Sequence, residues 1–256
     1  MTGLPPEFDA WLTSGLWQFG LIFLRVSALV SLLPAFGEKT VPVRVKLGLA
    51  IAFTLVVAPS LPGLVPPKDF AGFSSLAVTE VAVGLALGLG VRLFVIALQT
   101  AGAIAAQATS LSQLLGGATA DPAPAMGHVL VVGGLALAVM SGLHVRATEL
   151  LIRSYELFPT GALPDARDLG LWGVGRIARA FKLAFMLAAP FAIASLIYYL
   201  TLGVINRAMP QLMVAFVGAP VITLGGLFLL FAGAPLMLSV WTEALNGFLS
   251  DPTGVK

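Results

Sequence analysis

This chain of 256 residues contains no cysteine, which excludes disulfides, thiolate metal sites, cysteine nucleophiles and iron–sulfur clusters. It is also poor in charge, because Asp, Glu, Lys and Arg together make up 10% of it, whereas hydrophobic residues make up 58%. The mean hydropathy is +0.99. A chain so apolar and so sparsely charged is typical of membrane proteins and not of ordinary soluble domains.

The few charges do not favour nucleic acid as a partner. Lys and Arg number 14 against 12 Asp and Glu, for a net charge of +2, and a nucleic-acid surface needs basic residues clustered on one face. The two histidines, His128 and His144, lie at no spacing typical of zinc ligands, so we expect neither a metal nor another cofactor. HExxH, GxSxG and paired-carboxylate motifs are also missing, so we expect no enzymatic activity.

Six apolar runs predict an all-α membrane protein with about six long helices, many of them kinked by Gly or Pro. Clusters of proline separate the first three runs, as expected where helices end. The N-terminal residues lack the basic region of a cleavable signal and contain Glu7 and Asp9, so we expect the first run to be retained. The expected helices cover residues 16–33, 47–65, 76–98, 129–151, 182–205 and 211–248.

The last two runs have the pattern of a helical hairpin. Residues 183–242 form a stretch of 60 residues with one formal charge, Arg207, next to Pro210. Each arm is long enough for a helix that crosses a bilayer, which needs about 20 apolar residues. Proline lacks a backbone donor and disfavours helix at the preceding residue, so we expect the chain to reverse at residues 206–210.

The distribution of positive charge conflicts with simple alternation across a bilayer. Lys39, Arg44 and Lys46 place the first corner in the cytoplasm by the positive-inside rule. Alternation through six spans then puts the more basic region of residues 167–182 outside. Either one run does not span, or the helices pack in a protein assembly and need not alternate across lipid.

Three charges lie in apolar surroundings: Arg25, Glu80 and Arg207. A charge at the centre of a lipid-exposed helix costs about 3 kcal/mol on insertion scales, so such residues face protein or water. For Arg25 and Glu80 two interpretations stay open, namely a conduction path or subunit contact and a purely structural ion pair. Arg92, nearer a helix end, fits a side chain that snorkels to an interface.

Glycines recur at helical spacing on two of the expected helices. Gly84 and Gly88 share one face of the third helix, and Gly218, Gly225, Gly226 and Gly233 share one face of the last. Such small-residue faces allow a neighbouring backbone to approach closely, so they predict either subunit packing or packing within the chain. Gly218 and Gly233 each begin a Gly-Ala-Pro triplet that we expect to bend the helix.

Residues 99–122 are uncharged until Asp121 but too polar for exposure to lipid, because they include Gln99, Gln107, Ser110, Ser112 and Gln113. They must line water or protein. Gly116 and Gly117 allow a flexible backbone, so the stretch fits either a loop that gates a cavity or a simple surface connection.

Several phrases occur in an order that resembles one known family. They include RVSALVSLLPAFGEKTVPVRVKLGLA, TEVAVGLALGLGVRL, QTAGAIAAQ, SYELFPTG, FKLAFMLAAPFAI and LGVINRAMPQLMVAFVGAPV. Together they resemble the R-type component of the bacterial flagellar export gate, which is the counterpart of the T component of injectisome type III secretion. The resemblance covers nearly the whole chain.

The resemblance implies a fold and a set of partners. It implies a P-component-like part, residues 1–180, followed by a Q-component-like helical hairpin, residues 181–256, built into a helical multi-subunit pore. The implied partners are P-type and Q-type gate subunits, the substrate-specificity switch membrane protein, the large export-gate protein, unfolded export substrates and membrane lipid. The implied location is the bacterial inner membrane at the flagellar basal body.

The resemblance also implies a pore plug near residues 107–120. Its expected residues are Gln107, Leu111, Leu114, Leu115, Gly116 and Gly117. The function that follows is a structural, pore-forming subunit that passes unfolded substrates. An injectisome counterpart stays an alternative, as does a small secondary transporter with Arg25 and Glu80 at a midplane site.

Overall fold

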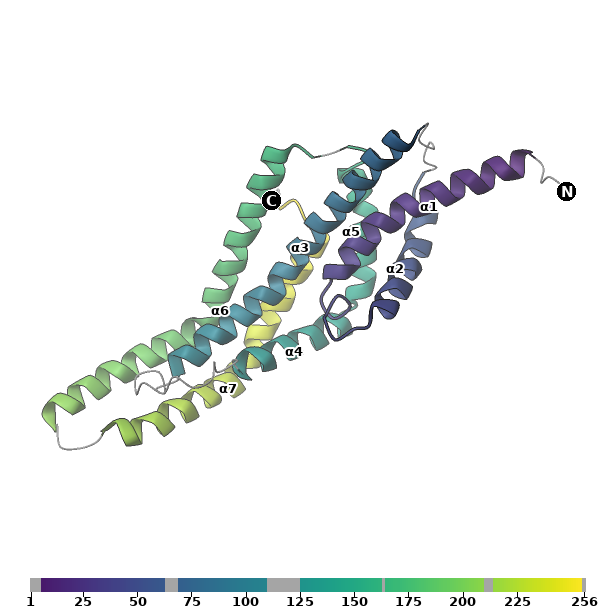
Figure 1. The fold of residues 1–256 in the computed structure, drawn as a ribbon. Coiled ribbons are helices and arrows are strands. Elements are labelled where there is room, and N and C mark those ends of the chain that lie inside the picture. Colours follow the sequence, from purple (N-terminus) through teal and green to yellow (C-terminus); the bar gives the residue numbers. More distant parts are fainter. Residues whose placement is uncertain (1–5, 63–68, 110–124, 163, 210–213, 255–256) are drawn as a thin grey trace. The chain divides into compact units, whose positions relative to one another are not determined.

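The computed structural model describes residues 6–62, 69–109, 125–162, 164–209 and 214–254. Within these ranges it contains helices and no strand, so the predicted all-α class is confirmed (Figure 1). The helices are α1 (Pro6–Leu32), α2 (Val43–Val57), the 3-10 helix η1 (Ala58–Ser60), α3 (Phe70–Thr109), α4 (Ala125–Met140), α5 (Leu143–Leu157), α6 (Ala166–Ala208) and α7 (Val214–Ser250).

Five helical stretches among the described residues are long and apolar enough to cross a membrane, and the bent pair of α4 and α5 brings the number to six if it counts as one span. The prediction of about six membrane helices is therefore confirmed in number. The stretches are Gly15–Leu32, Val43–Ser60, Phe70–Thr109, Ala166–Ala208 and Pro220–Ser250.

Proline marks the ends of the first two helices, as expected. Helix α1 ends at Leu32, two residues before Pro34, and α2 begins directly after Pro42. The predicted end of the second helix at residue 65 is wrong, because α2 ends at Val57 and a short 3-10 turn containing Pro59 follows. The ring of Pro59 removes a backbone donor that a continuing α-helix would use.

The third helix is longer than predicted. It runs to Thr109 and not to residue 98, so the first part of the polar stretch is helical. Residues 99–109 contain five alanines and no proline, and alanine has the highest helix propensity. Polarity therefore misled the prediction here, since Gln99 and Gln107 sit on a helix and not in a loop.

The predicted helix over residues 129–151 is two helices. Helix α4 ends at Met140 and α5 begins at Leu143, with Gly142 in the left-handed conformation at φ 82°. Residues with a side chain adopt this backbone conformation only at an energetic cost, so Gly142 allows the helix to break between α4 and α5. The connection between the expected helices 129–151 and 182–205 was also predicted too long, because α6 already begins at Ala166. Just before this helix, Asp165 Oδ1 accepts a 2.7 Å hydrogen bond from the Arg167 N–H.

Three prolines lie inside long helices and do not end them. Helix α6 continues through Pro190, and α7 through Pro220 and Pro235. Membrane helices tolerate such prolines because neighbouring groups satisfy the backbone atoms that proline leaves without a partner.

The chain divides into two compact units that interleave in sequence. Unit 1 comprises residues 1–92, 138–175 and 245–256, and unit 2 comprises residues 93–137 and 176–244. The predicted division at residue 180 separates a part that resembles the P-type subunit from a part that resembles the Q-type subunit. The fold of this chain alone does not test that resemblance, so the division stays a prediction.

The core of unit 1 forms where α1 packs against α2 and the first half of α3. Helix α1 contributes Leu21, Ile22, Val26 and Leu29, each at most 1% exposed, and α2 packs on α1 and on α5. The tight corner after α1 places Ala35 at φ 66° and lets the Gly37 N–H donate to the Leu33 carbonyl at 2.6 Å.

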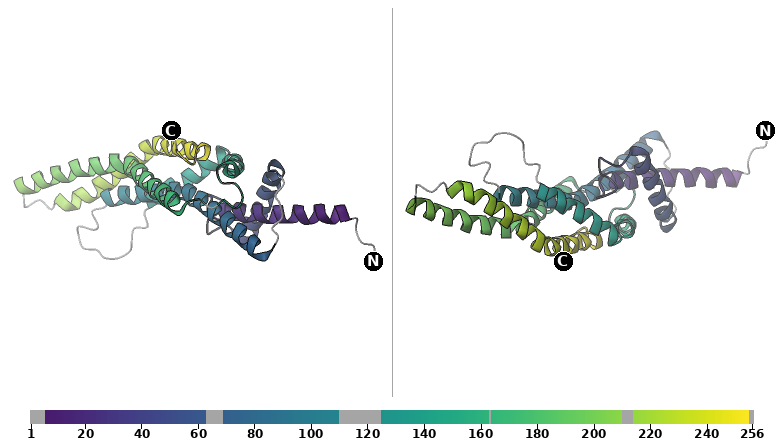
Figure 2. Two further views of the ribbon diagram at one scale, coloured as in Figure 1. Left: turned by 90° about the horizontal axis from the view of Figure 1, so that it is seen from above. Right: turned by 90° about the horizontal axis from the view of Figure 1, so that it is seen from below.

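Unit 2 contains the predicted hairpin as far as residue 244. Helix α6 ends at Ala208 and α7 begins at Val214, and both views of Figure 2 show the two arms side by side near this corner. The Tyr198 hydroxyl on α6 donates a 2.7 Å hydrogen bond to the Gly218 carbonyl on α7. In the same unit, Trp241 is fully buried and its indole N–H donates to the Phe94 carbonyl at 2.7 Å.

Candidate functional site

A buried ion pair lies at the centre of unit 1. Arg25 of α1 donates two hydrogen bonds to Glu80 of α3, from Nε to Oε2 at 2.8 Å and from Nη2 to Oε1 at 3.0 Å. Both residues are 0% exposed. The two parallel bonds form the bidentate geometry that a guanidinium and a carboxylate favour.

The end of α5 completes this cluster. Arg25 donates to the Ser154 hydroxyl at 3.1 Å and to the Phe158 carbonyl at 2.9 Å. The Tyr155 hydroxyl donates to Glu80 Oε2 at 3.1 Å, and the Arg25 guanidinium lies 3.7 Å from the centroid of the Tyr155 ring. We call Arg25, Glu80, Ser154, Tyr155 and Phe158 the charge cluster.

The charge cluster ties three helices together and leaves neither carboxylate oxygen without a donor. A buried ion pair repays its desolvation only where geometry is good and the remaining donors are satisfied, and both conditions hold here. Of the two interpretations left open for Arg25 and Glu80, the geometry therefore favours structural pairing. Arg92 has a similar partner, since it forms a half-buried ion pair with Glu38 in the corner after α1.

Arg207 has a different setting. It is exposed in the last turn of α6, where a cation interacts favourably with the negative end of the helix dipole. The described residues give it no ion pair. Its position at the corner of the hairpin agrees with the predicted reversal of the chain.

Gly84 and Gly88 lie against α1 of the same chain. A Cβ atom on Gly84 would collide with the Arg25 carbonyl and lie 2.8 Å from Ala28 Cβ, and one on Gly88 would lie 3.0 Å from Leu32 Cβ. The small-residue face thus lets α1 and α3 approach closely enough for Arg25 to reach Glu80. Of the two predicted roles for this face, subunit packing and packing within the chain, the structure favours packing within the chain, because α1 occupies the face.

The glycines of α7 fall into two groups. A Cβ on Gly218 would lie 3.2 Å from Leu202 of α6, and one on Gly226 would lie 2.5 Å from Thr109 of α3. Gly225 has no atom of the described chain within 4 Å of such a Cβ, and Gly233 has only a methionine sulfur at 3.9 Å. Within the described part of the chain, Gly225 and Gly233 thus have no close packing partner, and their predicted role in subunit packing stays a prediction.

The polar end of α3 is held firmly in unit 2. A Cβ on Gly102 would collide with Gly127 of α4, so these two backbones touch. The Tyr199 hydroxyl of α6 donates to the Ala108 carbonyl at 3.3 Å. Gln107 is exposed on the last turns of the same helix. The other five predicted plug residues, Leu111, Leu114, Leu115, Gly116 and Gly117, lie outside the described residues.

A hollow lies beside this polar end of α3. It has a volume of about 710 Å³ and is lined by Gln99 and Thr100 of α3 and by His128 of α4, among others. Of the polar residues named for this stretch, Gln99 borders the hollow, and the prediction that the stretch lines water or protein stays a prediction. Among the described residues, no group of three or more His, Asp or Glu side chains is placed to hold a metal ion.

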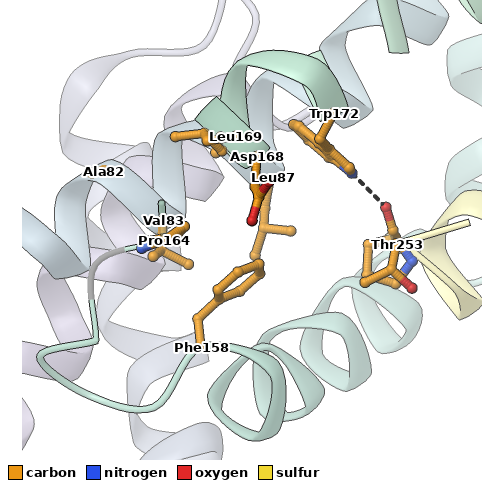
Figure 3. Close-up of a pocket in the computed structure, with 11 residues that line it drawn as sticks. Ala82, Val83, Leu87, Phe158, Pro164, Asp168, Leu169, Trp172 and Thr253 are labelled. Carbon is orange, nitrogen blue, oxygen red and sulfur yellow. Dashed lines mark hydrogen bonds between the residues drawn. The ribbon is translucent and has the colours of Figure 1, made fainter. Parts of the chain in front are cut away.

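A mostly apolar cavity of about 200 Å³ lies in unit 1 (Figure 3). Its walls come from α3, the start of α6 and the C-terminal segment, and Asp168 adds a carboxylate. The Trp172 indole N–H donates a 2.9 Å hydrogen bond to the Pro252 carbonyl, which fixes the C-terminal segment at this wall. Asp168 is the one charged side chain among the described residues that line the cavity.

Comparison with known proteins decides the family. The model of the family described as "Bacterial export proteins, family 1" matches residues 16–248. The chain belongs to the family 1 bacterial export proteins. The match includes the whole charge cluster, all of α6, and α7 as far as Phe248, so the resemblance found in the sequence is confirmed.

Among its relatives, this family 1 export protein is similar to the flagellar biosynthetic protein FliR of Caulobacter vibrioides, with 33% identity over 233 residues, which cover 90% of this chain and 93% of that protein. It is 34% identical over 240 residues to FliR of Escherichia coli K12, covering 90% of this chain and 88% of that protein. FliR of Bacillus subtilis is 27% identical over 208 residues, or 79% and 80% of the two chains.

Sequence reasoning missed several residues that hold these sites together. Ser154, Tyr155 and Phe158 all lie in the phrase SYELFPTG, which was noted as a family feature without a structural role. Gly102 and Gly127 were missed because each is a lone glycine, and no periodic pattern pairs them. Only the crossing of α3 and α4 makes the two glycines a contact.

Proposed function

We propose that this export protein is a structural, pore-forming subunit of the flagellar type III export gate in the bacterial inner membrane, at the flagellar basal body. The observation that carries the proposal is similarity along nearly the whole chain to proteins named FliR, at 33% and 34% identity over 90% of the chain. Unfolded export substrates pass through the pore, and other components supply the energy. The chain itself performs no chemistry.

The apolar surface of the hairpin supports a role inside an assembly. Only 22% of the most apolar stretch of α7 and 33% of that of α6 are buried within the chain. Large side chains such as Phe231, at 83% exposed, and Leu224, at 66%, cover the outside of α7. Lipid or neighbouring subunits must cover this surface, and we assign part of it to the P-type and Q-type gate subunits.

The open glycines of α7 support the same assignment. Gly225 and Gly233 have no side chain of their own and almost no neighbour among the described residues, so another helix can approach the α7 backbone there. We propose these two as subunit contacts. Gly218 and Gly226 serve the packing of the chain itself.

The anchored end of α3 supports a gate. Helices α4, α6 and α7 hold its last turn through contacts at Gly127, Tyr199 and Gly226, so the segment that follows starts from a fixed base. We propose that this segment plugs the pore, with Gln107 at its base and Leu111, Leu114, Leu115, Gly116 and Gly117 at its tip. The large export-gate protein and the substrate-specificity switch membrane protein are the further proposed partners.

A complementation experiment tests the proposed function. The chain is expressed in a bacterium from which the gene for FliR has been deleted, and secretion of flagellar proteins is measured together with motility. We expect both to be restored, and the chain to co-purify with P-type and Q-type subunits. A chain that restores neither, and that alone carries small solutes across liposome membranes, would instead be a transporter.

A further inference from the structure

A polar pocket in unit 1 lies apart from the residues that carry the proposed export function. It lies where α5 begins and α7 ends, with a volume of about 400 Å³. Its charged lining residues are Arg146, Glu149 and Arg153, all from α5. They recur at intervals of three and four residues and so share one face of the helix.

Two hydrogen-bond donors in this pocket lack a partner within the described part of the chain. Arg146 of α5 is half-buried, and none of its guanidinium N–H groups has an acceptor there. The side-chain amide of Asn246, on α7, is also half-buried and also has no acceptor among the described residues. Both groups are partly exposed, so a ligand that supplies acceptor oxygens can reach their donors.

The charge of the pocket favours an anion. Two arginines against one glutamate leave a net charge of +1 at its lining. Arg153 also donates a 2.8 Å hydrogen bond to the Ser250 carbonyl, which fixes this side chain at the edge of the pocket.

Apolar side chains around the pocket show what kind of anion fits. Met140 is 82% exposed and Val145 51% exposed, and they lie just before and within the first turn of α5. Helix α5 is itself amphipathic, because it buries Leu143, Ala147, Leu150 and Leu151 and turns its charged residues outward. A polar pocket beside exposed apolar residues suits a ligand with an anionic head and apolar tails.

We propose that this pocket binds the phosphate of an anionic membrane phospholipid, with Arg146 and Asn246 as the donors. Basic pockets between membrane helices bind phospholipid head groups in this way. The inference rests on the membrane character of the chain and does not depend on its role in export.

The test uses the full-length chain purified in a neutral detergent, with bound lipid counted by native mass spectrometry. The chain is titrated with phosphatidylglycerol, with phosphatidylcholine and with inorganic phosphate. We expect phosphatidylglycerol to bind most tightly. Arg146→Gln should weaken that binding by about 10-fold, since a hydrogen bond to a charged group is lost, whereas the exposed Arg167→Gln should leave it unchanged.

A second variant changes affinity in the opposite direction. Glu149→Gln removes the one negative charge from the pocket lining and should tighten binding of phosphatidylglycerol by about 2- to 5-fold. A merely structural role of these residues would not produce opposite effects. Circular dichroism melting confirms that each variant is folded, and Arg146→Lys, which keeps the charge, should retain part of the affinity.

The remaining outcomes separate the sources of phosphate. Binding of inorganic phosphate that depends on Arg146 and matches that of the lipid would keep the site and assign it to free phosphate. Equal binding of phosphatidylcholine and phosphatidylglycerol would overturn the proposal. So would an Arg146→Gln chain, shown to be folded, that binds as wild type.

Discussion

The two units of this export protein hold their helices together by different means. Unit 1 uses a buried ion pair, Arg25 with Glu80, surrounded by the hydroxyl and carbonyl groups of α5. In unit 2 the hydrogen bonds between helices include those from Tyr198, Tyr199 and Trp241 to backbone carbonyls. Glycine contacts bring backbones close in both units.

This difference indicates what each unit can do alone. The charge cluster is satisfied within unit 1 and specifies one arrangement of α1, α3 and α5. In unit 2, hydrogen bonds from Tyr and Trp side chains to backbone carbonyls hold the helices of the hairpin. Both units leave apolar surface uncovered, because only 22% of the apolar stretch of α2 in unit 1 and of α7 in unit 2 is buried within the chain. We infer that both units need lipid or other subunits, and that unit 1 has the more firmly fixed helix arrangement.

The largest effect is expected from filling the small-residue face of α3. Replacing Gly84 and Gly88 together by Leu should abolish assembly of the gate complex, because the new side chains hold α1 and α3 apart and separate Arg25 from Glu80. The yield of purified complex measures this. A normal yield would show that unit 1 does not depend on this close approach.

Breaking the charge cluster should have the next largest effect. Glu80→Gln leaves the Arg25 charge buried without a counter-ion and should lower the free energy of unfolding by about 3 to 5 kcal/mol. Denaturant titration in detergent measures the loss. The matched control is Glu156→Gln, because Glu156 is exposed on α5 and should contribute little.

A double variant separates charge from packing at the same site. Arg25→Met combined with Glu80→Leu should recover most of the stability, since a buried ion pair can often be replaced by apolar residues without loss. A double variant as unstable as Glu80→Gln alone would mean that the hydrogen bonds to α5 matter more than the balance of charge.

Deletion of residues 114–117 tests the proposed plug. The complex should still assemble, because the contacts of α3 with α4, α6 and α7 end at Thr109. The resting membrane should become leaky to small solutes, which uptake of a fluorescent dye or ion measures. Unchanged permeability with normal assembly would favour a simple surface connection.

A pair of glycine variants sharpens the comparison within α7. Gly225→Leu should leave the chain folded but reduce the recovery of P-type and Q-type subunits, because this glycine faces open space. Gly218→Leu should instead destabilise the chain itself, since its side chain would meet Leu202. Similar results for both variants would remove the distinction between inner and outer glycines.

The smallest effect is expected from Tyr198→Phe. The change removes one hydrogen bond between α6 and α7, from the hydroxyl to the Gly218 carbonyl, and keeps the ring. The expected loss is about 1 kcal/mol of unfolding free energy, measured by thermal melting in detergent. A loss as large as that of Glu80→Gln would contradict the expectation that a neutral hydrogen bond contributes less than the buried ion pair.

Composition and apolar periodicity predicted the helical class, the approximate number of membrane helices and the hairpin corner near Arg207. They were less successful at boundaries. The Ala-rich residues 99–109 were mistaken for a loop because Gln99 and Gln107 are polar, and the break at Gly142 was overlooked because a single glycine does not reveal its φ angle. Helix ends depend on local backbone geometry that composition describes poorly.

The sequence predicted some residues of these sites but not the residues that contact them. Arg25 and Glu80 could be recognised from the sequence, because each is a charged residue within an apolar run and an ionised side chain there needs a partner. Their contact with Tyr155 could not be read from the chain, since 75 residues separate Glu80 from Tyr155. The same holds for Gly102 and Gly127.

The sequence by itself determined that this protein is helical, belongs in a membrane and carries the phrases of an export-gate family, because apolar run length and motif order are properties of the chain alone. Only the tertiary structure decided which charges pair, which glycines touch α1 or α6 and which face outward. Those outcomes depend on how helices cross, and a crossing brings together residues whose separation in sequence carries no information about their distance in space.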